Sequence, residues 1–331
     1  MRKRTTYTII SFLISAFLIF IWLEFIDLSK FRFYLRKVKI PWVILASALY
    51  LFSYFIRSLR WRILLKPIKK LKRLKVYFIW MLGNFLNYVV PIRAGELAKS
   101  YFLKKTDGIP IARSLPSVFI DKLFDSIAIF VVIGLIPFLN IEISKTMLFL
   151  IILLVTIFIA GVFILTFSAF NKKLTAKFMK RFLFWIPEKY KIKFFELIDL
   201  FVEGISIFKN HYNLLPRVSF LTILSIFTDS LYFWLMFLSF GETVFFPIIL
   251  FGYTLINLSY IIPHPPAQIG SNEVIMVVIF SIGFGFQKEF VSAVMAFSHL
   301  LTGILIVSIG LTALSFLGMN LKESIKGLNK K

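Results

Sequence analysis

One interrupted apolar block carries a base and an acid close together. The block runs from Val76 to Leu103 and is broken by the sequence Val89-Val90-Pro91-Ile92-Arg93-Ala94-Gly95-Glu96. Arg93 offers a planar guanidinium that matches the oxygens of a phosphate, and Glu96 offers a carboxylate three residues later. Ionisable groups in apolar membrane segments are costly and usually functional, so we expect both residues to contact a substrate. The alternative is an ion pair between Arg93 and Glu96 alone.

A second apolar block, residues 245–286, is broken by the sequence Ile261-Ile262-Pro263-His264-Pro265-Pro266-Ala267-Gln268-Ile269-Gly270. Its candidate side chains are His264, Gln268, Asn272 and Glu273. Irregular backbone inside a membrane is tolerated only where protein or water satisfies its polar groups, so each break predicts a cavity. Glu96 and Glu273 fall in the first turn of the half-helix after each break, where any carboxylate interacts favourably with the helix dipole. His264 titrates near neutrality and could relay a proton.

Further polar side chains precede the first break or interrupt the apolar segments. Asn84, Asn87 and Tyr88 come just before the first break. The two asparagines could line the cavity or hydrogen-bond between helices, and we count all three residues as candidates for the substrate path. Asp229 and His299 are single polar residues in apolar segments, and we expect structural roles for them.

Two aspartates lie four residues apart, on one face of a predicted span. Asp121 and Asp125 could take part in the path of a substrate, or they could form structural ion pairs. The candidate partners are Lys122, Arg93 and Arg113. The aspartates also resemble half of a metal-binding motif of lipid phosphotransferases, but the upstream Asp-Gly portion of that motif is absent.

The elements that position these residues are long apolar segments. The chain of 331 residues is 59% hydrophobic, has a mean hydropathy of +0.86 and contains 41 phenylalanines. A membrane span needs about 20 apolar residues. The candidate spans are Tyr7–Leu23, Trp42–Phe55, Ser114–Phe138, Thr146–Phe167, Pro216–Phe240 and Val291–Phe316. Each arm of the two broken blocks is too short to cross alone, so both blocks predict hairpins that enter and leave on one side.

The expected fold is an all-α integral membrane protein with about six transmembrane helices and two re-entrant broken-helix hairpins. The first membrane repeat covers residues 1–140, with its hairpin at 76–104. The second covers 141–331, with a cytoplasmic amphipathic insert at 171–213 and its hairpin at 245–286. The sequence Tyr88-Val89-Val90-Pro91 matches Tyr260-Ile261-Ile262-Pro263 at the equivalent place. An inverted-topology repeat built from broken helices is typical of secondary transporters.

Basic residues are concentrated between the spans on one side. The formal net charge of +23 would suggest nucleic acid for a soluble protein, but nine Lys and Arg lie in residues 57–75 and ten in 172–217. The positive-inside rule therefore predicts a cell-membrane protein with both termini in the cytoplasm and no nucleic-acid partner. Residues 24–40 are basic on the opposite side, where we expect a helix on the outer interface. The insert 171–213 either binds anionic headgroups or is a solvated connector.

Motifs of nucleotide hydrolysis and of common hydrolases are absent from the sequence. The chain contains no Gly-x4-Gly-Lys-Ser/Thr loop, no His-Glu-x2-His and no Gly-x-Ser-x-Gly. It also contains no cysteine, which excludes disulfides and thiolate chemistry. We therefore expect neither an ATP-driven pump nor an enzyme, and we expect no cofactor and no bound metal.

Three motifs stand out together: Asn84…Pro91-x-Arg93-x-Gly95-Glu96, then Phe119-Ile120-Asp121-Lys122-Leu123-x-Asp125, then Pro263…Gly270-x2-Glu273. They resemble the lysylphosphatidylglycerol synthase transmembrane-region family, the flippase-like domains, over nearly the whole chain. That family usually has Glu-Arg in place of Asp121-Lys122, and Pro-Gly-Gly-x-Gly at the second break. Its membrane part is thought to move a lipid between leaflets, while a soluble domain attaches lysine. The resemblance implies translocation without lipid aminoacylation.

The leading hypothesis is a transporter that moves an anionic lipid, either a phospholipid or a polyprenyl-phosphate-linked lipid, between leaflets. Arg93 and the amide groups at the half-helix N-termini would hold the phosphate. Glu96 and Glu273 would gate the cavity or couple to a proton. The alternatives are a membrane-embedded lipid-phosphate transferase that uses Asp121 and Asp125, and a non-transporting lipid-binding scaffold.

Overall fold

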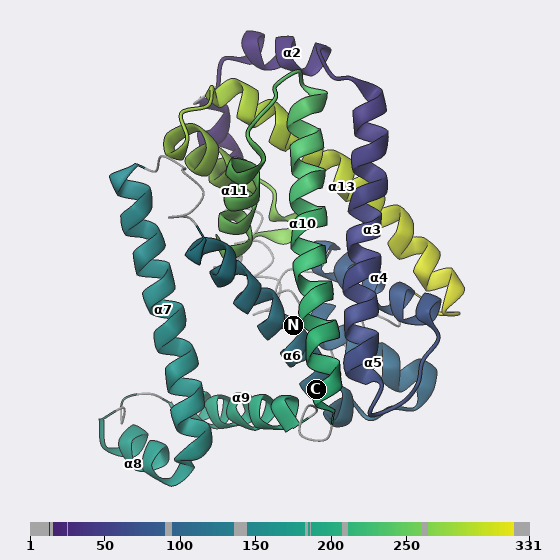
Figure 1. Cartoon of the computed structure of the whole chain (residues 1–331), viewed down its shortest axis with the longest axis vertical. Coiled ribbons are helices and arrows are strands. Elements are labelled where there is room, and N and C mark those ends of the chain that lie inside the picture. The colour runs from purple at the N-terminus through teal and green to yellow at the C-terminus, as the bar shows by residue number, and fades with distance from the viewer. Residues whose placement is uncertain are drawn as a thin grey trace.

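The computed structural model describes residues 13, 16–24, 26–89, 95–135, 144–182, 185, 187–206, 211–259 and 264–320 (Figure 1). Within these ranges the chain is helical and contains no strand, which confirms the all-α expectation for the part described. Arg93 lies outside the described residues, together with the break prolines Pro91 and Pro263.

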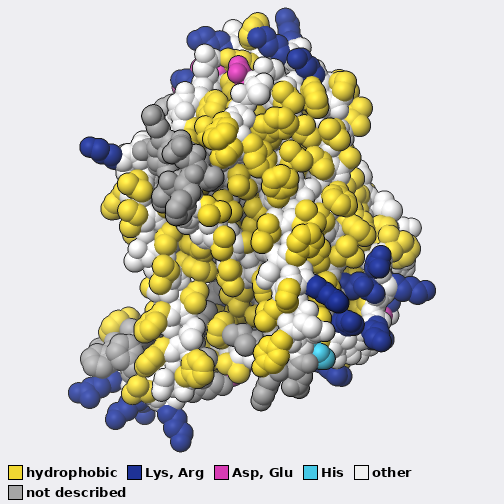
Figure 2. All heavy atoms as spheres, in the orientation of Figure 1, with side chains coloured by type: hydrophobic (Ala, Val, Ile, Leu, Met, Phe, Trp, Pro, Cys, Tyr) yellow, Lys and Arg dark blue, Asp and Glu magenta, His cyan; other side chains and the backbone are white. Residues whose placement is uncertain are grey.

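Four of the described helices are long and apolar enough to cross a membrane: Ile40–Leu65, Met147–Ser168, Tyr212–Ser239 and Lys288–Phe316. They belong to α3 (Ile40–Leu65), α7 (Lys145–Phe170), α10 (Leu215–Ser239) and α13 (Lys288–Phe316). Apolar side chains cover the middle of the face drawn in Figure 2, and Lys and Arg gather toward its two ends. This distribution is typical of a multi-pass membrane protein.

Two helices differ from the spans expected from sequence. α3 continues to Leu65, well beyond the predicted end at Phe55, and it carries Arg57 and Arg60 within the helix. The sequence analysis assigned both arginines to a cytoplasmic loop, and that assignment was wrong. α6 (Ile111–Gly134) contains most of the predicted span from Ser114, but it is not one of the four helices above, because charged side chains interrupt its apolar sequence.

The first broken block forms two packed arms, α4 (Arg73–Val89) and α5 (Gly95–Asp107). A glycine makes their close contact possible, since a Cβ atom on Gly95 would lie 1.9 Å from the carbonyl oxygen of Gly83. The N–H of Gly95 also donates to Oδ1 of Asn87 at 2.7 Å. The start of α5 is therefore fixed directly against the backbone of α4.

The second broken block follows the same plan with a longer connection. α11 (Phe246–Ser259) packs against α12 (Ser271–Met276) and against the π-helix η4 (Val277–Gly283) that continues it. Here too a glycine lies at the contact, because a Cβ atom on Gly252 would lie 2.3 Å from Cζ of Phe280. Turns of π-helix are rare and occur frequently at functional sites.

The two halves of the chain make corresponding helix contacts. α3 packs along α10 at the centre of the bundle. α4 packs against α13, and α11 packs against α6. In the same way, α3 contacts α4 and α6, while α10 contacts α11 and α13. Each contact has a counterpart when α3, α4 and α6 are matched with α10, α11 and α13.

One long helix stands at the edge of this bundle (Figure 1). α7 exposes most of the large apolar side chains that the structure describes on it, among them Phe149, Ile157 and Phe163. The ring of Phe158 stacks on Phe130 of α6, with 3.7 Å between their centroids. A helix that is apolar on all sides can be surrounded by lipid acyl chains, so we interpret α7 as a membrane-spanning helix that faces the lipid.

Amphipathic helices lie at the two ends of the molecule. The insert after α7 contains α8 (Lys172–Phe182) and α9 (Glu188–Ser206), and α9 packs against α6 and α7. α2 (Leu28–Arg36) lies at the opposite end and packs against α13 (Figure 1). Both predicted amphipathic segments are therefore helical, but the side of the membrane on which each lies stays a prediction.

Candidate functional site

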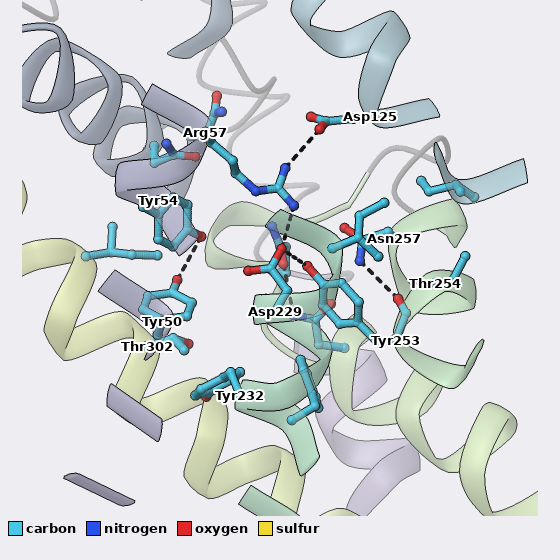
Figure 3. Close-up of a pocket in the computed structure, with 18 of the residues that line it drawn as sticks. Tyr50, Tyr54, Arg57, Asp125, Asp229, Tyr232, Tyr253, Thr254, Asn257 and Thr302 are labelled. Atoms are coloured by element: carbon cyan, nitrogen blue, oxygen red, sulfur yellow. Dashed lines mark hydrogen bonds and ion pairs between the residues drawn. The ribbon is translucent and has the colours of Figure 1, made fainter. Parts of the chain in front are cut away.

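A cavity of about 450 Å³ lies between the two halves of the bundle (Figure 3). Its walls come from α3, α4, α6, α10, α11 and α13, together with the starts of α5 and α12. The polar and aromatic lining residues are Tyr50, Tyr54, Arg57, Trp80, Asn84, Asn87, Tyr88, Glu96, Lys122, Asp125, Ser126, Phe130, Asp229, Tyr232, Phe233, Tyr253, Thr254, Asn257, Gln268, Asn272, Ser298, His299 and Thr302. Both broken blocks thus contribute residues to one cavity.

Arg57 connects the two halves across this cavity. Its Nη1 atom lies 3.1 Å from Oδ1 of Asp125 on α6, and its Nη2 atom lies 2.5 Å from Oδ2 of Asp229 on α10 (Figure 3). Asp229 also accepts hydrogen bonds from the hydroxyls of Ser53 and Tyr253, the latter at 2.7 Å. The guanidinium can make both ion pairs because its planar fork presents several donors in fixed directions.

Arg60 lies one helical turn further along α3, on the same face as Arg57. Its Nε atom donates to Oδ1 of Asp121 at 2.7 Å, and its Nη1 atom lies 2.8 Å from Oδ1 of Asp125. Arg60 is fully buried and Asp121 is 1% exposed. The two aspartates on one face of α6 therefore face two arginines on one face of α3.

The first break joins the same network through Glu96. Its Oε2 atom lies 2.8 Å from Nζ of Lys99, and its Oε1 atom lies 3.1 Å from Nζ of Lys122. The Lys99 side chain is buried, with its ammonium 4.1 Å from the ring centre of Trp80. Lys122 is different, because its side chain is 44% exposed and its ammonium also lies 3.6 Å from Asp125.

Among the residues that the structure describes, the charges in this network balance. Four bases face four acids, namely Arg57, Arg60, Lys99 and Lys122 against Glu96, Asp121, Asp125 and Asp229. Each has an oppositely charged partner, which offsets the cost of removing it from water. Deleting one member of such a buried pair typically costs about 3–5 kcal/mol, because its partner is left buried and unpaired.

A separate pair lies at the second break. Nδ1 of His299 lies 2.6 Å from Oε1 of Glu273, and Nε2 of His299 lies 2.7 Å from the carbonyl oxygen of Ala267. A carbonyl only accepts, so Nε2 carries a proton and donates it. The Nδ1 contact then needs a second proton, held either by the imidazole or by the carboxyl. Glu273 also accepts from the N–H of Gly270 at 2.7 Å.

The break around this pair has an unusual backbone. Ala267 has φ 50° and Gln268 has φ 62°, both in the left-handed region that favours glycine. Such residues persist where the surroundings hold them, and His299 holds Ala267 through its carbonyl oxygen.

The sequence of this chain matches a known family model over residues 8–310, under the description lysylphosphatidylglycerol synthase TM region. The chain belongs to that family. It is also 26% identical over 325 residues to the UPF0104 membrane protein MJ1595 of Methanocaldococcus jannaschii, which covers 95% of this chain and 96% of the relative. No solved structure matches the chain. The family and the apolar helices together identify a multi-pass membrane protein.

In this member of the lysylphosphatidylglycerol synthase TM region family, most residues predicted from sequence lie around the cavity. Those that line it are Asn84, Asn87, Tyr88, Glu96, Asp125, Gln268 and Asn272. Asp121 and Glu273 lie behind the lining, where they bind Arg60 and His299. His264 is a half-buried residue of the second break that does not line the cavity, and Arg93 lies outside the described residues.

Two expected features of the family motifs differ in detail. Glu96 pairs with Lys99 and Lys122. Asp125 lies 3.6 Å from the expected partner Lys122, but both aspartates of α6 also pair with Arg60 of α3, which was not expected. We expected the free N–H groups at the half-helix N-termini to bind an anion. One of them is not free, because the N–H of Gly95 donates a hydrogen bond to Oδ1 of Asn87.

Four residues of the candidate site were not singled out by sequence reasoning. Arg57 and Arg60 were assigned to a loop, and the structural roles expected for Asp229 and His299 stay a prediction. A usable signal was present, because two arginines spaced three apart directly after an apolar run continue the same helix. An arginine buried there requires an acid on a neighbouring span, and Asp229 is the single acid of α10.

Proposed function

We propose that this protein moves a phosphate-bearing anionic lipid between the two leaflets of the cell membrane, with the headgroup passing through the central cavity. The observation that carries the proposal is the ion-paired network lining a cavity within apolar helices. Charged side chains at membrane depth are costly and usually mark the path of a charged substrate. The lipid tails would stay in the bilayer, to which α7 exposes most of its surface.

Lys122 is the base best placed to meet the phosphate. Its side chain is 44% exposed, whereas the side chains of Arg60 and Lys99 are buried. A phosphate that binds Lys122 would replace Glu96, and Glu96 would keep its bond to Lys99. When the phosphate replaces Glu96 at Lys122, every charged group keeps an oppositely charged partner. Binding and release of the headgroup therefore leave no buried charge unpaired. Phosphate binding by Arg93 stays a prediction.

The membrane arrangement that we propose is an inverted repeat of about six spans and two re-entrant hairpins, divided at residues 1–140 and 141–331. The corresponding contacts of the two sets of helices support it. Both termini and the insert 171–213 would lie on the cytoplasmic side, where basic residues meet anionic headgroups. Movement of one repeat against the other would open the cavity to each side in turn.

The test is a leaflet-exchange assay on purified protein in liposomes with fluorescent phosphatidylglycerol or a short-chain polyprenyl phosphate. Glu96→Gln and Lys122→Ala remove two charges next to the cavity. Glu188→Gln is the matched control, because Glu188 is 76% exposed on the insert and pairs only with Lys191 among the described residues. We expect exchange by the parent protein, at least about tenfold slower exchange by the two cavity variants, and no change in the control.

The alternatives predict other results in the same experiment. A lipid-phosphate transferase would return a chemically altered lipid, which mass spectrometry of the recovered lipid would reveal, and a scaffold would give no exchange. Exchange that proceeds equally well in all variants would contradict the assignment of the cavity as the path.

A further inference from the structure

A continuous row of aromatic rings forms one side of the cavity. Neighbouring ring centres are 4.7 to 5.3 Å apart, and the row crosses from α4 over α3 and α10 to α11. In order, the rings are Trp80, Tyr54, Tyr50, Tyr232, Phe233 and Tyr253, and all six line the cavity. Figure 3 shows four of these tyrosines around the same space. Because all six rings line the cavity, the row offers an aromatic surface to a molecule inside it.

Neutral hydrogen-bonding groups complete the walls. Side-chain amides from both hairpins line the cavity, at Asn84, Asn87, Asn257, Gln268 and Asn272. Asn272 is 5% exposed, and its Nδ2 atom donates to Oε1 of Gln268 at 2.9 Å. Oδ1 of Asn272 and Nε1 of Trp80 are among the buried side-chain atoms that have no hydrogen-bond partner in the described part of the chain. Leaving such an acceptor and donor unpaired is costly, and both residues line the cavity.

This combination of walls fits a sugar. A sugar ring presents apolar C–H faces that pack on aromatic rings, and an edge of hydroxyls that donate to amide oxygens and accept from N–H groups. We propose that the headgroup recognised in this cavity is a phosphate joined to a sugar, with the sugar against the Trp80–Tyr253 row and the phosphate at Lys122. The inference deepens the proposed lipid transport and rests on it.

Other headgroups fit these walls less well. A bare phosphate would leave the side-chain amides and the aromatic row of the cavity without a group to contact. Asp229 is not available to a cationic amine, because both of its oxygens are taken, one by Ser53 and the other by Arg57 and Tyr253. A site built to bond hydroxyl groups also rejects analogues that lack them, since its own polar atoms are then left unpaired.

Binding to the full chain in detergent tests the inference separately from transport. The probes are geranyl phosphate and its glucosyl, mannosyl and N-acetylglucosaminyl phosphodiesters, titrated calorimetrically. We expect at least one sugar-bearing probe to bind about tenfold or more tightly than geranyl phosphate, which corresponds to one additional satisfied buried hydrogen bond. Asn272→Leu and Tyr54→Leu should each reduce this preference about tenfold. Tyr212→Leu, at a tyrosine that is 68% exposed outside the cavity, should preserve it.

The outcomes separate the two proposals. A preference for a sugar-bearing probe that the cavity variants weaken supports the inference, even if no lipid exchanges in liposomes and the proposed transport fails. Equal binding of all four probes overturns the inference, even if geranyl phosphate binds and lipid exchange proceeds. A preference that Asn272→Leu and Tyr54→Leu both leave intact, while their thermal unfolding is normal, also overturns it.

Discussion

The guanidinium of Arg57 lies 2.5 Å from the carboxylate of Asp229, so that a base of the first half of the chain binds an acid of the second half. Arg57 belongs to α3 and Asp229 to α10, the two helices that pair at the centre of the bundle. The bond therefore holds the two halves together at the wall of the cavity. Any movement of one half against the other has to change this contact.

The first prediction concerns that ion pair. Arg57→Leu should lower the free energy of unfolding by about 3–5 kcal/mol, because Asp229 loses its cation while it stays buried. The double variant Arg57→Leu/Asp229→Asn should recover much of the loss. Glu188→Gln, which breaks an ion pair at a carboxylate that is 76% exposed on the insert, should cost no more than about 1 kcal/mol. Equilibrium unfolding of the purified variants in detergent measures all three, and equal losses for Arg57→Leu and Glu188→Gln would contradict the role of Arg57.

A second prediction concerns the start of α5. Gly95→Ala should prevent normal folding, because the new Cβ atom would lie 1.9 Å from the carbonyl oxygen of Gly83. Gly161→Ala on α7 is the matched control, since no atom lies within 4 Å of its Cβ position. There the substitution should be neutral or stabilising by up to about 1 kcal/mol, as expected for alanine in a helix. Expression level and gel filtration compare the two, and a normally folded Gly95→Ala protein would contradict the contact between the arms.

The third prediction concerns the second break. His299→Leu should cost about 3–5 kcal/mol of stability, because Glu273 loses a buried partner and the carbonyl of Ala267 loses its donor. The break should then open more readily, which limited proteolysis of protein in nanodiscs would detect between α11 and α12. Thr302→Ala, one helical turn further along α13, is the control. Unchanged stability and proteolysis in His299→Leu would mean that the pair does not hold the break.

The fourth prediction concerns orientation, and the absence of cysteine makes it simple to test. Single cysteines replace three exposed lysines: Lys30 on α2, Lys70 after α3 and Lys189 on α9. A maleimide that cannot cross membranes should label only Lys30→Cys in intact cells, and all three after the cells are opened. Labelling of Lys189→Cys in intact cells would reverse the proposed orientation.

Most of the architecture could be predicted from sequence because it depends on apolar length and on breakers. The interruptions were placed correctly, since the arms α4, α5, α11 and α12 end or begin beside the Pro-Gly breaks. That these arms form re-entrant hairpins stays a prediction. The end of α3 was wrong, because charge was taken to end a span. A charged residue can continue a buried helix when a distant acid pairs with it, and that pairing depends on three-dimensional contacts that local pattern does not contain.

The site was predictable to a similar extent. Asn87, Glu96 and Asn272 were found because they stand close to a break, and all three line the cavity. Their partners could not be found in this way. Lys99 lies on the apolar face of a half-helix, and the six-ring row is assembled from four helices whose aromatic residues look like ordinary core positions in a chain with 41 phenylalanines.

The charges of the cavity bear on what drives lipid movement. Among the described residues the ion-paired network has no net charge. If no other ion travels with the headgroup, a lipid with one negative charge carries that charge across alone. Moving one elementary charge through a membrane voltage is worth about 2.3 kcal/mol per 100 mV. In a cell with a negative interior, this voltage would pull the lipid outward. The bilayer's own electrical potential would then set the direction of lipid flow without any nucleotide being spent.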